Sequence, residues 1–223
     1  GPLENPKPDF ILACHTWPDM PAGSIGVRKG TMLGASDSFK VKVIGKGGHA
    51  AHPQKGIDPV VIAAHIITQL QTIVSRRVAA IDPVVVTVGH LEAGTAANII
   101  PNEAYFEGTV RTQSNETRNH VAEILKQLAI GTARAMGGDA EVSSTFGVGP
   151  TISEDHLVDE ISEAVTELLG NDKLLQVPSP SMGSEDFARY LEHIPGAIFR
   201  LGTHNDTPES KLALHNASLL FDE

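Results

Sequence analysis

The feature that most constrains the fold is a run of six elements over residues 38–148, in the order strand, helix, strand, strand, helix, strand. Its first strand places Phe39, Val41 and Val43 in alternation with polar residues, which predicts one buried face. This order is the split βαβ pattern of a ferredoxin-like sandwich. The two ends of such a unit lie near each other, so it can be inserted into another domain. We therefore expect residues 37–148 to form a domain.

Helix-start residues and apolar spacing predict both helices of this run. Asp58 as N-cap and Pro59 at the first position open a helix that reaches about Arg77, and Ser114 caps a second helix that reaches about Met136. The buried stripes expected from the helical spacing are Val60, Ala63, Ala64, Ile67, Leu70 and Val74 in the first helix, and Val121, Ile124, Leu125 and Leu128 in the second. The strands are expected from Ser38 and at residues 83–92, 104–112 and 140–148.

The segments on either side of this run have an α/β pattern. An apolar strand at residues 9–13 ends at Cys14-His15 and precedes a turn-rich stretch. Later segments predict an amphipathic helix, a short helix capped by Ser184 and a buried strand, at residues 155–169, 184–193 and 197–201. The stripe expected for the first of these helices is Leu157, Ile161, Val165 and Leu168. We expect residues 1–36 and 149–223 to pack together as one interrupted domain of an α/β protein.

Composition narrows the classes of partner. The chain has 17 Lys and Arg against 27 Asp and Glu, a net charge of −10, and only 4% aromatic residues. Nucleic-acid-binding proteins present basic faces and stacking aromatics, so no nucleic-acid partner is expected. No apolar run approaches the roughly 18 residues that span a bilayer, so no membrane partner is expected. The single cysteine, Cys14, excludes a disulfide within the chain and fits a reducing compartment.

The two ends of the sequence predict a piece of a longer protein. The chain begins at Gly1-Pro2 without a Met, which is typical of what a tag-removing protease leaves. Its last five residues, 219–223, resemble the approach to another element. No basic region followed by an apolar core stands at the start, so no signal peptide is visible. We expect a cytoplasmic protein.

Three of the ten histidines occur in contexts that could carry chemistry. His15 follows a buried strand, where α/β proteins build their sites, and imidazole is a good ligand for zinc. His49 lies in a loop whose glycines permit close approach of a ligand. His215 follows an apolar pair near the C-terminus. Each histidine also has a structural interpretation, as a hydrogen-bonded half-buried residue, a turn residue and a surface residue respectively.

Two further segments carry polar residues in suggestive places. Residues 182–187 place Glu185 and Asp186 in the first turn of a predicted helix, where complementing the helix dipole alone would explain them. Residues 94–101 form a polar loop that contains Asn98, between two predicted strands. Taken alone, these residues support only the hypothesis of an α/β metal site with an inserted lid.

Seven segments together resemble successive motifs of one protein family. They are residues 15–18, 45–53, 56–59, 94–101, 108–112, 182–187 and 214–216. The family comprises the aminoacylase/carboxypeptidase-type zinc metallopeptidases. The resemblance is to their amidohydrolase branch, which contains hippurate hydrolases, N-acetyl-diaminopimelate deacetylases and indole-acetyl-amino-acid hydrolases. The match runs in the right order from about Leu3 to Glu223.

The resemblance implies a zinc-peptidase α/β catalytic domain with an inserted ferredoxin-like lid that mediates homodimerisation. Members of the family bind two divalent metal ions. Zinc is the metal expected here, and manganese, cobalt and nickel are alternatives. His15 and His215 match metal-ligand positions. Glu185 matches an acid that lines the catalytic site.

The resemblance also assigns roles to the lid. His49 matches the lid histidine that reaches the substrate carbonyl in the transition state, often from the partner subunit. Asn98 and Arg111 match residues that bind the carboxylate end of the substrate. Many relatives place a second histidine after the proline of the lid loop, whereas here His52 precedes Pro53.

Two family motifs are missing from this sequence. Relatives carry, before the strand that leads to His15, a Cys-Gly-His-Asp metal motif and a Glu-Glu pair whose first member is the general base. Without them the metal site is incomplete in this chain, and residues 1–223 alone are expected to be inactive. The expected function of the parent protein is metal-dependent hydrolysis of the amide bond of N-acyl amino acids or small peptides by metal-activated water. The alternative is an inactive module that self-associates through the lid.

Overall fold

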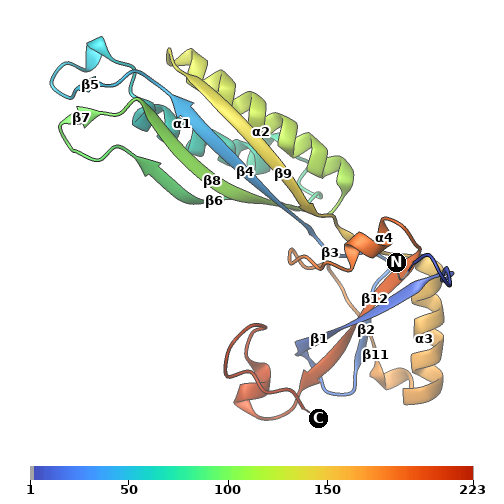
Figure 1. The fold of residues 1–223 in the computed structure, drawn as a ribbon. Helices are drawn as coiled ribbons and strands as arrows, with labels where there is room; N and C mark the ends of the chain where they lie inside the picture. Colours follow the sequence, from blue (N-terminus) through green and yellow to red (C-terminus); the bar gives the residue numbers. More distant parts are fainter. Residues whose placement is uncertain (1–2, 223) are drawn as a thin grey trace. The chain divides into compact units, whose positions relative to one another are not determined.

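The computed structural model describes residues 3–222, which divide into two compact units, each with its own hydrophobic core (Figure 1). The sandwich unit comprises residues 34–149 and 182–184, and the split unit comprises residues 3–33, 150–181 and 185–222. Gly1, Pro2 and Glu223 lie outside the described residues, so the interpretation of Gly1-Pro2 as a protease remnant does too.

The sandwich unit is a four-stranded antiparallel sheet with two helices on one face (Figure 1). Its strand order is β6-β8-β4-β9. The elements are β4 (Ala35–Ile44), α1 (Pro59–Thr72), β6 (Val84–Ala93), β8 (Glu103–Thr112), α2 (Asn115–Ala135) and β9 (Asp139–Val148). This is the predicted chain order, so the ferredoxin-like fold is confirmed.

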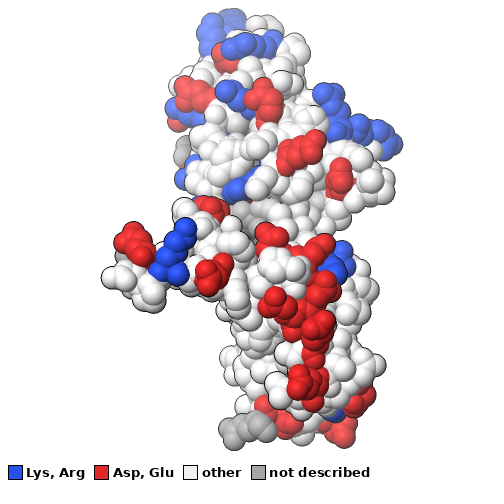
Figure 2. Space-filling view, turned by 90° about the vertical axis from the view of Figure 1, so that its right-hand side faces the viewer, with Lys and Arg blue, Asp and Glu red and all other residues white. Residues whose placement is uncertain are grey.

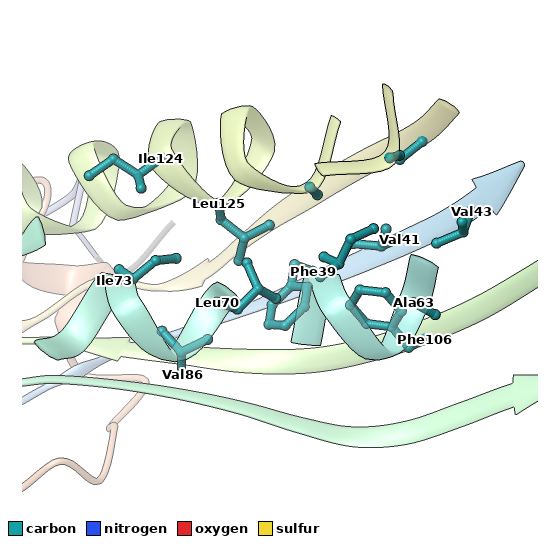
Figure 3. Close-up of a cluster of buried hydrophobic side chains, with 14 of the residues drawn as sticks. Phe39, Val41, Val43, Ala63, Leu70, Ile73, Val86, Phe106, Ile124 and Leu125 are labelled. Carbon is teal, nitrogen blue, oxygen red and sulfur yellow. The ribbon is translucent and has the colours of Figure 1, made fainter. Parts of the chain in front are cut away.

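The core of the sandwich unit fills the space between the sheet and the helices (Figure 3). Phe39 of β4 and Phe106 of β8 meet edge to face, with ring centroids 6.5 Å apart, which is a favourable aromatic geometry. Gly108 makes this possible, because a Cβ atom there would lie only 2.7 Å from the Phe39 ring. Leu70 of α1 and Leu125 of α2 close the core from the helical side.

Helix α1 begins where the sequence predicts but buries a different face. The Asp58 carboxylate accepts hydrogen bonds from the backbone N–H groups of Val60 and Val61, as an N-cap does. The buried residues of α1 are Pro59, Ile62, Ala63, Ile66 and Leu70. The predicted stripe is therefore wrong at Val60 and Val74, both 42% exposed, and at Ala64. Eight of the nine residues from Pro59 to Ile67 are apolar, so spacing alone does not select a face in this part of the helix.

Helix α2 follows its prediction closely. The Ser114 hydroxyl accepts from the backbone N–H of Thr117, which confirms the predicted cap. The residues of its predicted stripe that are buried are Val121, Ile124 and Leu125, and Leu128 packs against the same core. Its Arg118 forms a buried ion pair with Asp37 of β4, with Nε 2.8 Å from Oδ2. Asp37 also accepts from the backbone N–H of Gly147, so one carboxylate ties together β4, α2 and β9.

The split unit has a mixed four-stranded sheet in the order β1-β12-β2-β11, and α3 packs on one face. Its elements are β1 (Ile11–Pro21), β2 (Ile25–Val27), β3 (Gly30–Leu33), β10 (Thr151–Ser153), α3 (Asp155–Leu169), β11 (Leu174–Gln176), α4 (Ala188–Leu191) and β12 (Gly196–His204). Strands β3 and β10 form a separate antiparallel pair. Acidic side chains gather in a band over α3 (Figure 2), where Asp155, Asp159, Glu160, Glu163 and Glu167 are exposed.

The first strand of the split unit is longer than predicted. Strand β1 does not stop near Ala13, because its parallel pairing with β12 continues through His15–Arg200 to Trp17–Gly202. The expectation that His15 stands at a strand end is therefore wrong. Pro18 is tolerated within the strand because β1 lies at the edge of the sheet, where a missing N–H breaks no ladder.

Two helix predictions in the split unit need correction. Helix α3 ends at Gly170 as predicted, but Leu168 is 79% exposed and does not belong to the buried stripe. The short helix begins only at α4, with Phe187 at its N-cap position, so Ser184 does not cap it. In the described part of the chain, no helix is long and apolar enough to cross a membrane.

Candidate functional site

His15 and Glu185 form the clearest polar pair of the split unit. His15 Nε2 lies 3.5 Å from Glu185 Oε2, and both side chains are about one-quarter exposed, at 28% and 26%. His15 Nδ1 lies 2.7 Å from the Thr16 carbonyl oxygen, which can only accept, so Nδ1 carries the proton. In a neutral imidazole this leaves the lone pair of Nε2 directed at the Glu185 side, and metal-binding histidines commonly have this arrangement.

The spacing of this pair can be compared with metal geometry. Two ligand atoms on one tetrahedral zinc ion, each about 2.0–2.2 Å from it, lie roughly 3.4 Å apart. The observed 3.5 Å between Nε2 and Oε2 fits two neighbouring positions of such a site. Within residues 3–222, however, no group of three or more His, Cys, Asp or Glu side chains is placed to hold an ion. The pair therefore supplies at most part of a metal site.

His215 is not grouped with the His15–Glu185 pair in the described part of the chain. It occupies the exposed segment after the short helix η4 (Pro208–Lys211), and its backbone φ of 68° is in the left-handed region. Histidine is among the residues enriched in that region, so this conformation needs no functional explanation. The structure does not bring His215 into a group with His15 and Glu185 among the described residues.

The tip of the sandwich unit brings His49 and Asn98 together. The two short strands β5 (Gly48–His49) and β7 (Ile99–Ile100) pair antiparallel, with His49 opposite Ile99 (Figure 1). The Ala50 N–H donates to the Asn98 carbonyl at 3.1 Å, which extends this pairing. Both candidate side chains are exposed at the tip, beside a pocket of about 500 Å³ next to the start of α1. The sequence analysis singled out both residues but did not predict the pairing of β5 with β7.

A backbone hydrogen bond defines which nitrogen of His49 carries the proton. The Ala51 N–H donates to His49 Nδ1 at 3.0 Å. Nδ1 is therefore an acceptor, and in the neutral ring the proton resides on Nε2. The His49 side chain thus presents an exposed N–H donor, which suits stabilisation of an oxyanion. The His52 ring lies nearby, with ring centroids 5.8 Å apart.

Asn102 holds the loop that carries His49, and the sequence analysis missed it. Its backbone carbonyl accepts from the Gly45 N–H at 2.9 Å, and its side-chain Oδ1 accepts from the Gly47 N–H at 2.9 Å. Gly47 has no room for a side chain, because a Cβ would lie 2.8 Å from the Ile100 oxygen and 2.9 Å from Asn102 Oδ1. The glycine pattern of this loop is the sequence signal that could have indicated such a close neighbour.

Arg111 lies at the opposite end of the sandwich sheet from that tip. Strand β8 runs from Glu103, beside the tip, to Arg111 near its far end, which is roughly 27 Å at about 3.4 Å per residue. Arg111 is half-buried and donates through Nη1 to the Ser184 hydroxyl at 3.0 Å. Within one chain, Arg111 and Asn98 are too far apart to hold the same carboxylate.

A cluster of ionisable residues occupies the face of the sandwich sheet away from the helices. The Tyr105 hydroxyl donates to Glu107 Oε2 at 2.5 Å, and Lys40 and His90 flank the same carboxylate at 3.6 and 3.8 Å. The Tyr105 hydrogen bond lowers the pKa of Glu107 below its ordinary value, and the same bond raises the pKa of Tyr105. The cluster borders a pocket of about 350 Å³ where β6 has an irregular register between Val88 and His90. The sequence analysis did not single out these residues.

Comparison with known proteins connects these sites to one family. Residues 33–135 match the model of the M20 peptidase dimerisation domain. The chain is 38% identical over 213 residues to N-acetylcysteine deacetylase of Bacillus subtilis and 36% identical over 222 residues to N-acetyldiaminopimelate deacetylase of Leuconostoc citreum. These matches cover 96% and 97% of the chain but 54% of each relative, so the chain spans about half the length of the curated relatives it matches.

Similarity to solved structures points to the same family as similarity to the sequences. A dinuclear metal-binding peptidase of the M20 family from Bacillus subtilis superposes with a TM-score of 0.79 at 31% identity, over 96% of this chain and 52% of that one. A second structure, from methicillin-resistant Staphylococcus aureus, reaches a TM-score of 0.89 at 26% identity, over 96% of this chain and 55% of that one. The family resemblance seen in the sequence is thereby confirmed: the chain is a relative of the M20 metallopeptidases, and it contains their dimerisation domain.

Proposed function

We propose that the full gene product is a metal-dependent amidohydrolase that cleaves N-acyl amino acids or small peptides. The observation that carries this proposal is the His15–Glu185 pair, in which the imidazole Nε2 lies 3.5 Å from a carboxylate oxygen, at ligand spacing. The deacetylase relatives support the substrate class, because both named relatives act on N-acetylated compounds according to their names. The net charge of −10 is consistent with the absence of a nucleic-acid partner.

The metal part of the proposal assigns His15 as a ligand and Glu185 as its neighbour in the catalytic site. His215 is proposed as a further ligand. Two divalent ions, with zinc expected and manganese, cobalt or nickel as alternatives, would supply an activated water and a polarised amide carbonyl when bound. In this proposal residues 1–36 and 149–223 are part of the catalytic domain, and residues 37–148 form the lid. The protein is proposed to be cytoplasmic.

The lid residues divide between two tasks in this proposal. His49 donates its Nε2 proton as a hydrogen bond to the oxyanion that develops on the substrate carbonyl. Asn98 and Arg111 bind carboxylate groups, and Arg111 has the fork of donors that suits them. Because Asn98 lies at the tip, near the Glu103 end of β8, and Arg111 lies near the other end of that strand, a single active site that uses both must take them from two chains. A homodimer is therefore part of the proposed mechanism.

The proposed dimer surface combines α1 with the edge strand β6. Val60 and Val61 of α1 are 42% and 46% exposed, and Val74, in the π-helical turn Ile73–Arg77 that follows α1, is 42% exposed. Strand β6 lies at the edge of the sandwich sheet and exposes Val85 and Leu91. Unprotected apolar edges are sites of association, so a second copy of this surface is the expected partner.

Sedimentation tests the dimer in the chain as it stands. The chain of residues 1–223 should sediment as a dimer, and Val61→Glu on α1 should shift it to monomer, whereas Leu168→Glu on α3 should not. A strict monomer over a wide range of concentration contradicts the proposed surface.

Activity assays test the function itself. The full gene product, loaded with zinc or manganese, should hydrolyse members of a panel of N-acyl amino acids and dipeptides, and His15→Ala should lose metal and activity together. A dimeric, metal-free product that hydrolyses nothing in the panel supports the self-association module instead.

A further inference from the structure

Arg200 is the one residue of the described chain whose buried cationic side chain has nitrogens without hydrogen-bond partners. It lies on β12 in register with His15, and only 7% of its surface is exposed. Its Nε and Nη2 atoms are fully covered and have no hydrogen-bond partner within residues 3–222. Long cationic side chains are almost never this buried unless they are paired, so the arrangement needs an explanation.

The neighbours of Arg200 engage its flat face but not its edge. The guanidinium carbon lies 3.7 Å from the centroid of the Trp17 ring, a close cation–π contact. Burial lowers the pKa of Arg200 below its ordinary value, and the charge of Asp19 acts in the opposite direction. Arginine nevertheless keeps its proton at neutral pH, so a full positive charge is held here without a hydrogen-bonded counter-charge.

Other arginines of the same chain show what the free edge is suited to bind. Arg118 turns its Nε and Nη2 atoms to the two carboxylate oxygens of Asp37. Arg134 turns the same two nitrogens to Asp139 on the surface. This edge presents two parallel N–H donors whose spacing matches the two oxygens of a carboxylate. Arg200 presents the same pair of donors, and both are buried without a hydrogen-bond acceptor from the described part of the chain.

We propose that the Nε–Nη2 edge of Arg200 is a binding site for a carboxylate supplied from outside the described chain. The carboxylate can come from a small molecule or from an acidic side chain of another polypeptide segment, and its chemistry is the same in both cases. Both nitrogens are covered here, so the incoming carboxylate must displace covering groups, and small carboxylates are the appropriate probes. The site is separate from Arg111 and does not depend on the hydrolase proposal.

Trp17 provides a direct reporter of this site, because it is the only tryptophan of the chain. Sodium acetate titrated into the chain should change Trp17 fluorescence saturably, whereas sodium chloride at equal ionic strength should not. In arginine-edited NMR spectra, the Nε–H signal of Arg200 should move toward the position of the Arg118 Nε–H signal, which reports a carboxylate-paired arginine. The Arg200 signal is identified by its loss in Arg200→Lys.

The two variants separate the charge from the fork of donors. Arg200→Lys keeps the charge but loses the parallel donors, and should weaken acetate binding about tenfold, the loss of one hydrogen bond to a charged group. Arg200→Gln should abolish the response. If the wild-type chain shows no saturable response in fluorescence or NMR, or if Arg200→Gln responds like the wild type, the proposal is overturned. The wild-type titration decides even if a variant fails to fold.

The same titration on the full gene product distinguishes the two sources. If a small molecule supplies the carboxylate, the full product binds acetate as this chain does. If an acidic side chain supplies it, the Arg200 Nε–H signal of the full product lies at the paired position before any acetate is added, and acetate does not move it. Both results support a carboxylate site. An unpaired Arg200 signal that acetate does not move in the full product contradicts it.

Discussion

Each of the two units buries an arginine, and the two arginines differ in their hydrogen-bond partners. In the sandwich unit, Arg118 and Asp37 are 11% and 8% exposed and satisfy each other, with Gly147 as a further partner. In the split unit, Arg200 is similarly buried and stacks on the Trp17 ring, but its Nε and Nη2 atoms have no hydrogen-bond partner among residues 3–222. Removing one partner of a buried ion pair is strongly destabilising, because the other charge is then buried without compensation. Removing a buried cation that has no partner leaves no such charge behind. The comparison therefore predicts opposite responses to the same substitution.

The largest expected effect is on the paired arginine. Arg118→Met should lower the free energy of unfolding of the sandwich unit by about 3–5 kcal/mol, because it leaves the Asp37 charge buried without compensation. Urea unfolding followed by far-UV circular dichroism measures this loss. Trp17 fluorescence follows the split unit separately, because the chain has no other tryptophan.

Two matched arginines sharpen this prediction. Arg134→Met removes an exposed partner of Asp139 and should change stability by less than about 1 kcal/mol. Arg200→Met should also change stability by less than about 1 kcal/mol, because the lost cation–π contact is offset by the removal of an unpaired buried charge. Equal losses in Arg118→Met and Arg200→Met would remove the distinction between the units.

The next effect concerns the exposed tip of the sandwich unit. His49→Ala in the full gene product should lower kcat by roughly 10²–10³, as loss of one oxyanion donor does, while metal content is unchanged. His52→Ala is the matched control, because this ring lies beside His49 but no structural feature orients it as a donor. A similar loss in both variants argues for a structural role of the loop.

Mixing tests whether the tip acts across chains. His15→Ala should lose metal and activity, since it removes a proposed ligand. Combining this protein with inactive His49→Ala protein should restore part of the activity, because a hybrid dimer then contains one site with both histidines. No recovery after confirmed subunit exchange would mean that His49 acts within its own chain or is only a turn residue.

A smaller effect separates the helix starts of the two units. Asp58→Ala should lower the stability of the sandwich unit by about 1 kcal/mol, because the carboxylate caps two N–H groups of α1. Glu154 occupies the N-cap position of α3 in the split unit but makes no side-chain capping hydrogen bond, so Glu154→Ser should raise stability by roughly 0.5–1 kcal/mol. Thermal unfolding followed by the two probes above measures both changes. A loss in both variants would contradict the capping account.

The sandwich unit could be predicted from sequence far better than the split unit, for a physical reason. Its strands contain ten residues each, long enough for alternation to define a buried face. The strands β2, β3, β10 and β11 contain three or four residues, which is too short for any period to emerge. The start of helix α1 was predicted correctly but its buried face was not, because the residues from Pro59 to Ile67 are almost all apolar and their spacing does not distinguish one face from another.

The site residues show a second limit of sequence reasoning. Local patterns suggested His15 and His49, but hydrogen bonds to Thr16 and Ala51 decide which nitrogen is free. Ser184 has the residue type of a helix cap, yet it accepts a hydrogen bond from Arg111, 73 residues earlier in the chain. Partners this distant cannot be read from a single sequence, since only the folded chain brings them together.

The smallest effect that we predict lies on the exposed face of the sandwich sheet. The Tyr105 hydrogen bond lowers the pKa of Glu107 below 4.5 in the folded state. A carboxyl whose folded pKa is depressed contributes stability above its unfolded pKa, and this contribution is lost as pH falls below about 4.5 through the folded value.

Tyr105→Phe removes the hydrogen bond, so the pKa of Glu107 should rise toward 4.5 and the acid-dependent part of the stability should shrink. NMR titration of the Glu107 carboxyl carbon measures the shift. The Lys40→Met variant is the control, because it removes the neighbouring positive charge but keeps the Tyr105 hydrogen bond, which is the largest single cause of the lowered pKa of Glu107. A larger shift in Lys40→Met than in Tyr105→Phe would show that charge, and not the hydrogen bond, sets the ionisation of this cluster.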